Sequence, residues 1–230
     1  MSAPLDAPLR DPLLSALGIT HGFGQRETTA PSDTAFPKQV HGTAVHEHRA
    51  GTGADADVEA DAIVTREAGA SVGIVTADCV PILVAHREGE SVAAIHAGWR
   101  GLAAGVIEAG LRGVAAGGDV GACVAAIGPA ARGCCYEVDE PVRAGLRERY
   151  ADLLDGVLVP GRPERFQLDL PAMAGRVLEK NGVETQRIGV DARLCTICSP
   201  DRFESYRRDG AAAGRLRHFI ARPAAIPRQG

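Results

Sequence analysis

The chain has 230 residues, of which 45% are hydrophobic and 23% are charged, and its formal net charge is −4. This length and composition support the buried core of an ordinary soluble globular domain. The negative balance argues against a broad nucleic-acid footprint but permits a local basic pocket. No apolar stretch reaches the length of a membrane span. Residues 1–16 carry early acids and prolines without the apolar core of a signal peptide, so we expect a weakly ordered lead-in and a cytoplasmic protein.

Short apolar runs separated by polar connections predict several strands in the first half of the chain. The expected strands cover residues 17–23, 36–46, 62–65, 73–77, 82–85 and 92–95. Residues 24–36 are polar and predict a loop, and residues 51–61 are rich in Gly, Ala and Asp and predict a surface connection. Residues 87–90 supply a turn before the last of these strands.

Helices and strands alternate in the second half. Apolar residues recur near the helical period over residues 101–116, which predicts an amphipathic helix ended by Gly117 and Gly118. Two further helices are expected after the capping residues Asp139 and Asp169, each with a proline near its start. The expected strands cover residues 123–127, 166–168, 188–190 and 216–221.

The balance of these elements predicts the fold class. Strands outnumber helices, and several strands follow one another without an intervening helix, which favours α+β over a doubly wound parallel sheet. We therefore expect a mixed β-sheet sandwich flanked by helices. It would form a single compact domain over residues 17–222, with a tail at residues 223–230.

The six cysteines are too few for a disulfide scaffold, and in a cytosolic protein we expect them to be reduced. Cys134 and Cys135 are adjacent and do not readily bridge each other. Cys195 and Cys198 have the spacing of a zinc knuckle but lack a second pair in the sequence. We interpret them as small residues packed in a turn before Pro200.

Three reactive side chains form the most informative set. Cys79 follows one apolar run, His96 ends another, and His41 lies in the segment F-P-K-Q-V-H-G-T. Two imidazoles and a thiolate suit zinc, and three protein ligands leave a fourth position open for water or substrate. The three residues are far apart in the chain, so a core thiol with hydrogen-bonded interior histidines remains an alternative.

Residues beside this set extend the prediction. Asp78 sits next to Cys79 at the end of an apolar run, where it either orients a ligating imidazole or caps a turn before Pro81. We therefore expect Cys79, His96 and Asp78 to take catalytic roles. Gln39, on the same predicted strand face as His41, is expected to hydrogen-bond a substrate, although a surface glutamine would look the same in sequence.

Arginines beside glycine-rich backbone predict an anion site, because forked guanidinium groups hold phosphate well. A solvated basic turn that pairs with Glu204 and Asp209 is the alternative for the segment S-Y-R-R-D-G. The sequence does not single out one arginine. The candidates for substrate or phosphate binding are Arg100, Arg207, Arg208 and Arg215.

Several blocks in the same order resemble the laccase-domain family, whose members have been called polyphenol oxidases and are now read as multifunctional purine nucleoside phosphorylases. The blocks are Q-V-H-G-T, T-A-D-C-V-P-I-L, H-A-G-W-R-G, A-I-G-P-A-A-R-G-C-C-Y-E-V, L-D-L and C-T-I-C followed by S-Y-R-R-D-G and G-R. The resemblance runs from about residue 39 to residue 220. The resemblance implies that His41, Cys79 and His96 bind the catalytic zinc.

The same resemblance implies a set of reactions and partners. They are phosphorolysis of adenosine, inosine and S-methyl-5'-thioadenosine to free base and sugar 1-phosphate, and deamination of adenosine to inosine. The implied partners are purine nucleosides and phosphate. The chain departs from the family in residues 24–37, which are shorter than usual and lack the G-G-V-S-like and S-L-N-L-G blocks. If that segment lines the pocket elsewhere, substrate range and activity differ here.

Other functions remain open at this level. A peptidoglycan-precursor editing hydrolase is described among family relatives, and Cys79 activated by His96 would suit a metal-free hydrolase. Copper is the alternative metal, for oxidation of phenols, but seven histidines and two methionines are few for such centres. A zinc-stabilised accessory protein without turnover is the non-enzymatic reading. The sequence leaves monomer and homodimer open.

Overall fold

The computed structural model describes residues 6–49, 55–184, 186, 188–190 and 194–224, which form three β-sheets and six α-helices. The strands are β1 (Thr20–Gly22), β2 (Val45–His48), β3 (Ala62–Thr65), β4 (Ser71–Thr76), β5 (Val80–His86), β6 (Val92–Ala97), β7 (Cys123–Ile127), β8 (Glu137–Val138), β9 (Leu158–Pro160), β10 (Phe166–Leu168), β11 (Ile188–Val190) and β12 (Leu216–Ala221). The helices are α1 (Pro12–Ala16), α2 (Trp99–Ala104), α3 (Val106–Ala115), α4 (Glu140–Tyr150), α5 (Leu170–Lys180) and α6 (Tyr206–Asp209).

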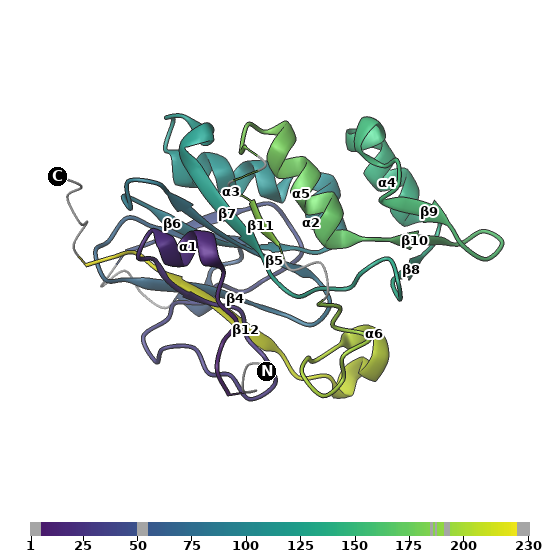
Figure 1. The fold of residues 1–230 in the computed structure, drawn as a ribbon, viewed down its shortest axis with the longest axis horizontal. Helices are drawn as coiled ribbons and strands as arrows, with labels where there is room; N and C mark the ends of the chain where they lie inside the picture. Colours follow the sequence, from purple (N-terminus) through teal and green to yellow (C-terminus); the bar gives the residue numbers. More distant parts are fainter. Residues whose placement is uncertain (1–5, 50–54, 185, 187, 191–193, 225–230) are drawn as a thin grey trace.

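The largest sheet has six strands in the order β11-β7-β5-β6-β3-β2 and is mixed, because its two outer pairs are parallel and its inner pairs antiparallel. A smaller antiparallel sheet, β1-β12-β4, packs on one face of it through β4 and β12 (Figure 1). Fully buried aliphatic residues fill the space between these two sheets, among them Ile63, Ile74, Leu83 and Ile220. The prediction of a mixed β-sheet sandwich in an α+β domain is confirmed.

Helices α3 and α5 cover the opposite face of the large sheet (Figure 1). Their apolar sides form a second core with the sheet, which includes Ile107, Leu111, Met173 and Val177. A third sheet, β8-β10-β9, extends from this layer beside α4. The molecule is therefore layered as small sheet, large sheet and helices.

The long helix predicted over residues 101–116 is divided in the structure. Gly105 adopts a left-handed conformation with φ of 98°, which ends α2 and begins α3. An added Cβ at this position would also approach the Arg149 guanidinium to 2.6 Å. The apolar period continued across the break, so the sequence pattern concealed it.

The strand predicted over residues 36–46 is wrong for most of its length, since β2 is Val45–His48. His41 has a φ of 61°, and Val40 is 45% exposed. The cause is the Asp61 carboxylate, which accepts hydrogen bonds from the backbone N–H groups of Val40, His41 and Gly42. Three consecutive donors aimed at one carboxylate require a turn, and an extended strand cannot supply it.

Part of the predicted lead-in is helical. The Asp11 carboxylate caps α1 by accepting from the N–H groups of Leu13 and Leu14, and the Leu14 side chain is fully buried. Residues 1–5 and 225–230 lie outside the described residues. The structure therefore describes only part of the predicted lead-in and only part of the predicted tail. None of the helices in the described part of the chain combines the length and apolar character needed to cross a bilayer.

Candidate metal centre

Strand pairing brings Cys79 next to His96. The chain passes from β4 in the small sheet to β5 in the large sheet through residues 77–79. Antiparallel pairing of β5 with β6 then sets Pro81 opposite His96 and Val80 opposite Ala97. The start of β5 therefore lies beside the end of β6, so Cys79 and His96 lie close together at one end of these two strands.

His41 completes the group from the turn described above. Its ring meets the His96 ring edge to face, with centroids 4.9 Å apart. One ligand atom from each of His41, Cys79 and His96 lies within 4.8 Å of the other two. Gly98 makes this approach possible, because an added Cβ would lie 3.0 Å from both Cys79 Sγ and His41 Cδ2. The structure therefore brings the predicted set together.

Asp61 positions His41 and His96, and this role was not predicted from the sequence. Asp61 immediately precedes β3, where it lies beside His96 on β6. Its backbone oxygen accepts from the His96 N–H at 2.7 Å, and its Oδ1 lies 2.7 Å from His96 Nδ1. The prediction of a surface connection is wrong for Asp61, which is fully buried. A carboxylate directly before the apolar residues 62–64 of β3 was the available signal.

Hydrogen bonding polarises this group of side chains. Burial by itself raises the pKa of the Cys79 thiol, but hydrogen bonds with His41 and His96 lower that pKa to about 7. Burial also disfavours the charged form of His96, while hydrogen bonds to Asp61 and Cys79 raise its pKa to about 9. The thiolate form of Cys79 is favoured, as a metal ligand requires.

The group opens on a cavity of about 590 Å³, within the range of small-molecule sites. His41 is exposed, Cys79 half-buried and His96 buried, so access comes from the His41 side. Two imidazoles and one thiolate fit the preferences of zinc, and a carboxylate on His96 Nδ1 is the usual support of a zinc-binding imidazole. The lining residues are Pro37, Gln39, His41, Val75, Thr76, Ala77, Cys79, His96, Trp99, Arg100, Tyr206 and Arg215.

Asp78 points elsewhere. It is buried, with a φ of 86°, and its carboxylate accepts from the hydroxyls of Thr196 at 2.6 Å and Ser205 at 3.0 Å and from the Arg207 N–H at 2.6 Å. The carboxylate that orients His96 is Asp61. A catalytic role for Asp78 stays a prediction, and its contacts indicate that it positions the two segments it joins.

Gln39 lines the cavity, but its amide is engaged. Its Nε2 donates to the Val75 carbonyl at 2.8 Å, and its Oε1 accepts from the Val75 N–H at 2.7 Å. This pairing ties the His41 segment to β4. Substrate binding by Gln39 stays a prediction.

The four arginine candidates separate into two groups. Arg100 and Arg215 line the cavity, and Arg100 and Arg207 line an adjoining cavity of about 450 Å³. Arg100 stacks over the Trp99 ring at 4.5 Å, and Arg207 stacks over the Tyr136 ring at 4.7 Å. Arg208 instead donates to the carbonyls of residues 196, 197 and 203 and to Asp209, so its guanidinium organises the chain.

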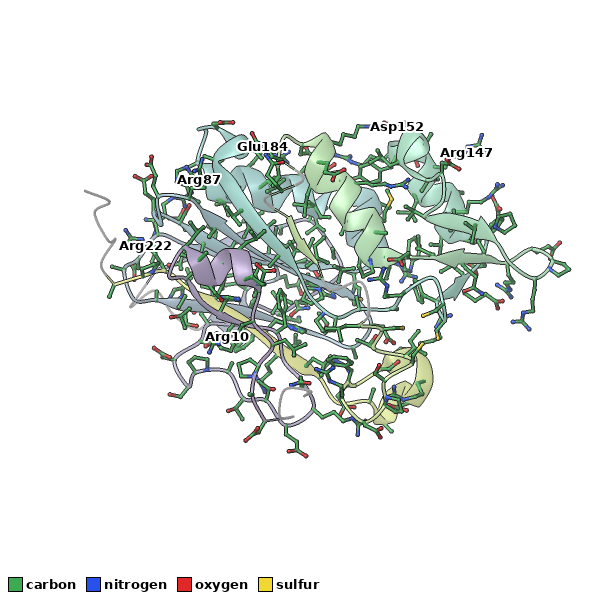
Figure 2. All side chains as sticks on the ribbon, in the orientation of Figure 1. Arg10, Arg87, Arg147, Asp152, Glu184 and Arg222 are labelled. Carbon is green, nitrogen blue, oxygen red and sulfur yellow. The ribbon has the colours of Figure 1, made fainter. Side chains whose placement is uncertain are left out.

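A second cysteine cluster was not expected. Cys134 and Cys135 lie beside Cys195 and Cys198, with ligand sulfur atoms within 4.8 Å of one another. Figure 2 shows yellow sulfur atoms gathered in the loops beside α6. The sequence contains no second Cys-x-x-Cys pair, but the fold brings the adjacent residues Cys134 and Cys135 to Cys195 and Cys198.

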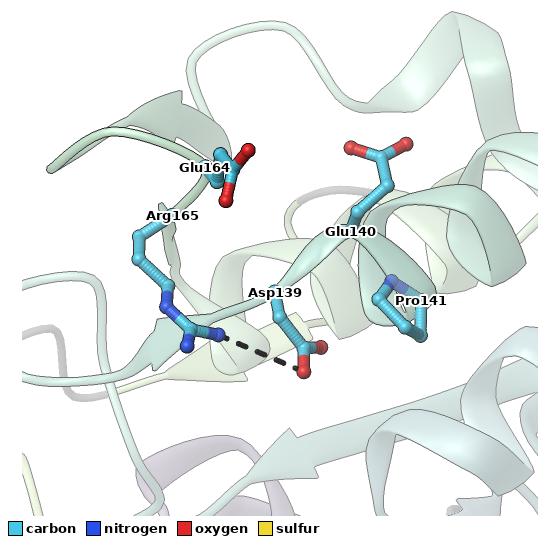
Figure 3. Close-up of a pocket in the computed structure, with 5 residues that line it drawn as sticks. All are labelled: Asp139, Glu140, Pro141, Glu164 and Arg165. Carbon is cyan, nitrogen blue, oxygen red and sulfur yellow. Dashed lines mark ion pairs between the residues drawn. The ribbon is translucent and has the colours of Figure 1, made fainter.

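Another hollow lies where α4 begins, lined by Asp139, Glu140, Pro141, Glu164 and Arg165 (Figure 3). Arg165 Nη1 pairs with Asp139 Oδ2 at 3.7 Å. Its lining contains no thiol or imidazole, so it offers neither a nucleophile nor a soft metal ligand. The His41 cavity is the stronger candidate for chemistry.

Comparisons with known proteins identify named relatives of this chain. The purine nucleoside phosphorylase of Xylella fastidiosa (strain Temecula1 / ATCC 700964) is 40% identical over 151 residues, which cover 65% of this chain and 56% of the relative. Purine nucleoside phosphorylase SCO2081 of Streptomyces coelicolor is 38% identical over 193 residues, covering 83% of this chain and 75% of the relative. The chain thus spans little more than half the length of the first of these relatives.

Solved structures share the fold. YlmD from Geobacillus stearothermophilus superposes with a TM-score of 0.82 and 26% identity, covering 96% of this chain and 98% of that one. NMB0706 from Neisseria meningitidis gives a TM-score of 0.73 and 32% identity, covering 83% and 75%. Residues 23–223 match the family described as multi-copper polyphenol oxidoreductase laccase. The chain belongs to this laccase-domain family.

Proposed function

We propose that this protein is a zinc-dependent purine nucleoside phosphorylase that acts in the cytoplasm. Its substrates would be adenosine, inosine and S-methyl-5'-thioadenosine, cleaved with phosphate to free base and sugar 1-phosphate, and it would also deaminate adenosine. The relatives' names support the reaction class. The observation that carries the proposal is the convergence of His41, Cys79 and His96 ligand atoms within 4.8 Å at a cavity of about 590 Å³.

The three residues would hold zinc, and the ion when bound supplies Lewis acidity toward an electrophile or a water molecule. Asp61 fixes the His96 ring through Nδ1, which leaves Nε2 as the nitrogen available for the metal. Gly98 keeps the space beside Cys79 clear. These residues therefore prepare a site with one position left for substrate.

Phosphate binding is assigned to Arg100 and Arg207. Phosphorolysis needs phosphate held behind C1' of the sugar, which is a matter of positioning and charge. Arg100 lines both cavities, and Arg207 lies with it in the second. Aromatic stacking limits the motion of each guanidinium, which lowers the entropy lost on binding an anion.

The direct test incubates metal-quantified protein with inosine and phosphate and measures hypoxanthine by chromatography. We expect hypoxanthine and ribose 1-phosphate in equal amounts, and inosine from adenosine in a second reaction. Absence of hypoxanthine both with and without added zinc defeats the phosphorylase assignment. A muropeptide precursor in the same panel tests the hydrolase alternative.

A matched pair of variants tests the phosphate assignment. Arg207→Gln should raise the KM for phosphate by about 10-fold to 100-fold, since a charge-assisted hydrogen bond contributes about 1.5–3 kcal/mol. Arg147→Gln is the control, because Arg147 is an exposed arginine on α4 (Figure 2). Equal phosphate KM values in the two variants would remove Arg207 from the site.

Copper-dependent oxidation of phenols is a second candidate, favoured by the family's description and by a ligand set that also suits copper. A multicopper centre needs further imidazole groups. In the described part of the chain, the other candidate ligand groups are the four cysteines and His86 with Glu88 and Glu90. Oxygen uptake by copper-loaded protein with a phenol, faster than phosphorolysis by zinc-loaded protein, would favour this candidate.

A further inference from the structure

The four cysteines beside α6 form a compact sulfur cluster outside the proposed catalytic site. Their sulfur atoms lie within 4.8 Å of one another, and Cys134 Sγ is 3.3 Å from Cys198 Sγ. Cys195 is buried, Cys135 is half-buried, and the other two are exposed. All four are free thiols.

Backbone contacts fix the two loops that carry these thiols. A parallel bridge joins Ala130 to Cys195, and the Thr196 N–H donates to the Ala130 carbonyl at 3.1 Å. In the first loop, the Arg132 carbonyl accepts from the N–H groups of residues 135 and 136. The meeting of the thiols therefore follows from backbone geometry that does not depend on flexible side chains.

The spacing suits one tetrahedral ion. Four sulfurs at about 2.3 Å from zinc lie about 3.8 Å from each other. The observed sulfurs, all within 4.8 Å with one pair at 3.3 Å, bracket that separation. A single disulfide would leave two of the four thiols unexplained.

We propose that Cys134, Cys135, Cys195 and Cys198 bind one structural zinc ion. Four protein ligands close the coordination sphere, so the ion holds the two loops together and takes no substrate. This site is separate from the proposed catalytic site and does not depend on the proposed reaction.

The ion would also steady the proposed catalytic site from a distance. Thr196, between the last two cysteines, donates to Asp78, the neighbour of Cys79. Asp78 in turn accepts from the Arg207 N–H. Through these contacts the cysteine loop helps to position both Cys79 and the proposed phosphate-binding arginine.

Zinc content measured by elemental analysis is the first test, on full-length protein purified with zinc and a thiol reductant. We expect two zinc ions per chain in the wild type and one in Cys198→Ser, whose side chain is exposed. Cys79→Ser should also contain one. Cys123→Ala is the control and should keep two, because Cys123 lies in the core outside both groups.

X-ray absorption then identifies the ligands of the remaining ion. In Cys79→Ser with His96→Ala, the zinc that remains should show four sulfur neighbours at about 2.3 Å. If Cys198→Ser does not fold, the wild-type thiols are titrated with a mercurial instead. The titration should release two zinc ions, and release of the cluster ion should accompany modification of four thiols.

Two outcomes overturn the proposal: no zinc in the double variant, or nitrogen or oxygen ligands on its ion. These readouts are independent of turnover. Two zinc ions without hypoxanthine formation would defeat the proposed function alone. Hypoxanthine formation with a single zinc ion, lost in Cys79→Ser, would defeat this inference alone.

Discussion

The two sulfur-containing groups of this protein differ in how the chain builds them. The pairing of β5 with β6 positions Cys79 and His96, and together with His41 these residues line a cavity. The four-cysteine cluster joins two loops and offers four ligands of one kind. Three ligands with space beside them suit chemistry, whereas four ligands suit a fixed structural ion. We therefore expect the first group to take part in the reaction and the second to stabilise the fold.

Asp78 lies between the two groups and shows how they depend on each other. It precedes Cys79 in the chain and accepts a hydrogen bond from Thr196 of the cysteine loop. A substitution in the four-cysteine cluster should therefore disorder the group of His41, Cys79 and His96. A substitution in that group should leave the four-cysteine cluster intact.

The largest expected effect separates activity from stability. Cys79→Ser should lower phosphorolysis by about 1,000-fold or more, because a Lewis acid contributes several kcal/mol to the barrier. Cys198→Ser should lower the thermal midpoint by about 5–15 °C, as expected for a loss of about 2–4 kcal/mol in a chain of this size, with a smaller loss of activity. Initial rates and calorimetry on both variants measure the two effects. Equal losses of rate and midpoint in both variants would remove the distinction between the groups.

A smaller effect is expected from the carboxylate behind His96. Asp61→Asn should weaken zinc binding at the proposed catalytic site and lower activity by about 10-fold to 100-fold. The reason is that the hydrogen-bond partner of a ligating imidazole sets the orientation and basicity of that ring. Chelator competition measures the affinity. Asp55→Asn is the matched control, since Asp55 contacts the imidazoles of His46 and His48 away from the site. A similar loss in both variants would contradict a specific role for Asp61.

The smallest effect distinguishes two buried histidines. Hydrogen bonds to Asp61 and Cys79 outweigh burial at His96 and raise its pKa, whereas burial lowers the pKa of His218 to about 3. His218 Nδ1 accepts from the Gly24 N–H at 3.2 Å, and Nε2 lies 2.8 Å from Thr76 Oγ1, so the native ring is neutral. In the unfolded chain His218 binds a proton near pH 6.5, whereas in the native state it stays neutral until about pH 3. The contribution of His218 to the free energy of unfolding is therefore complete above pH 6.5 and decreases as the pH falls toward 3.

Urea unfolding at pH 7.5, 6.5 and 5.5 measures this effect. Below pH 6.5, His218 should contribute a decrease of at most about 1.4 kcal/mol per pH unit in the free energy of unfolding. His218→Asn should be less stable at pH 7.5 but lose less on acidification, because the amide oxygen can accept the Gly24 N–H and does not titrate. Parallel curves for the two proteins would assign the acid sensitivity to other groups.

Much of the fold was predictable because local patterns agreed with tertiary packing. Strands β7, β10 and β12 match the predicted residues, and Asp169 caps α5 as expected by accepting from the Ala172 N–H. The failures occurred where distant residues decide the backbone. Asp61 turns the segment that carries His41 out of its predicted strand, and no local pattern contains that information.

The sequence by itself determined the alternation of buried strands and helices and the identity of the three metal-ligand candidates, because apolar periodicity and side-chain chemistry are local properties. Only the tertiary structure decided that Asp61 supports His96, that Asp78 holds Thr196, and that two pairs of cysteines meet. These contacts arise from strand register and loop closure, which bring together groups that no spacing along the chain relates.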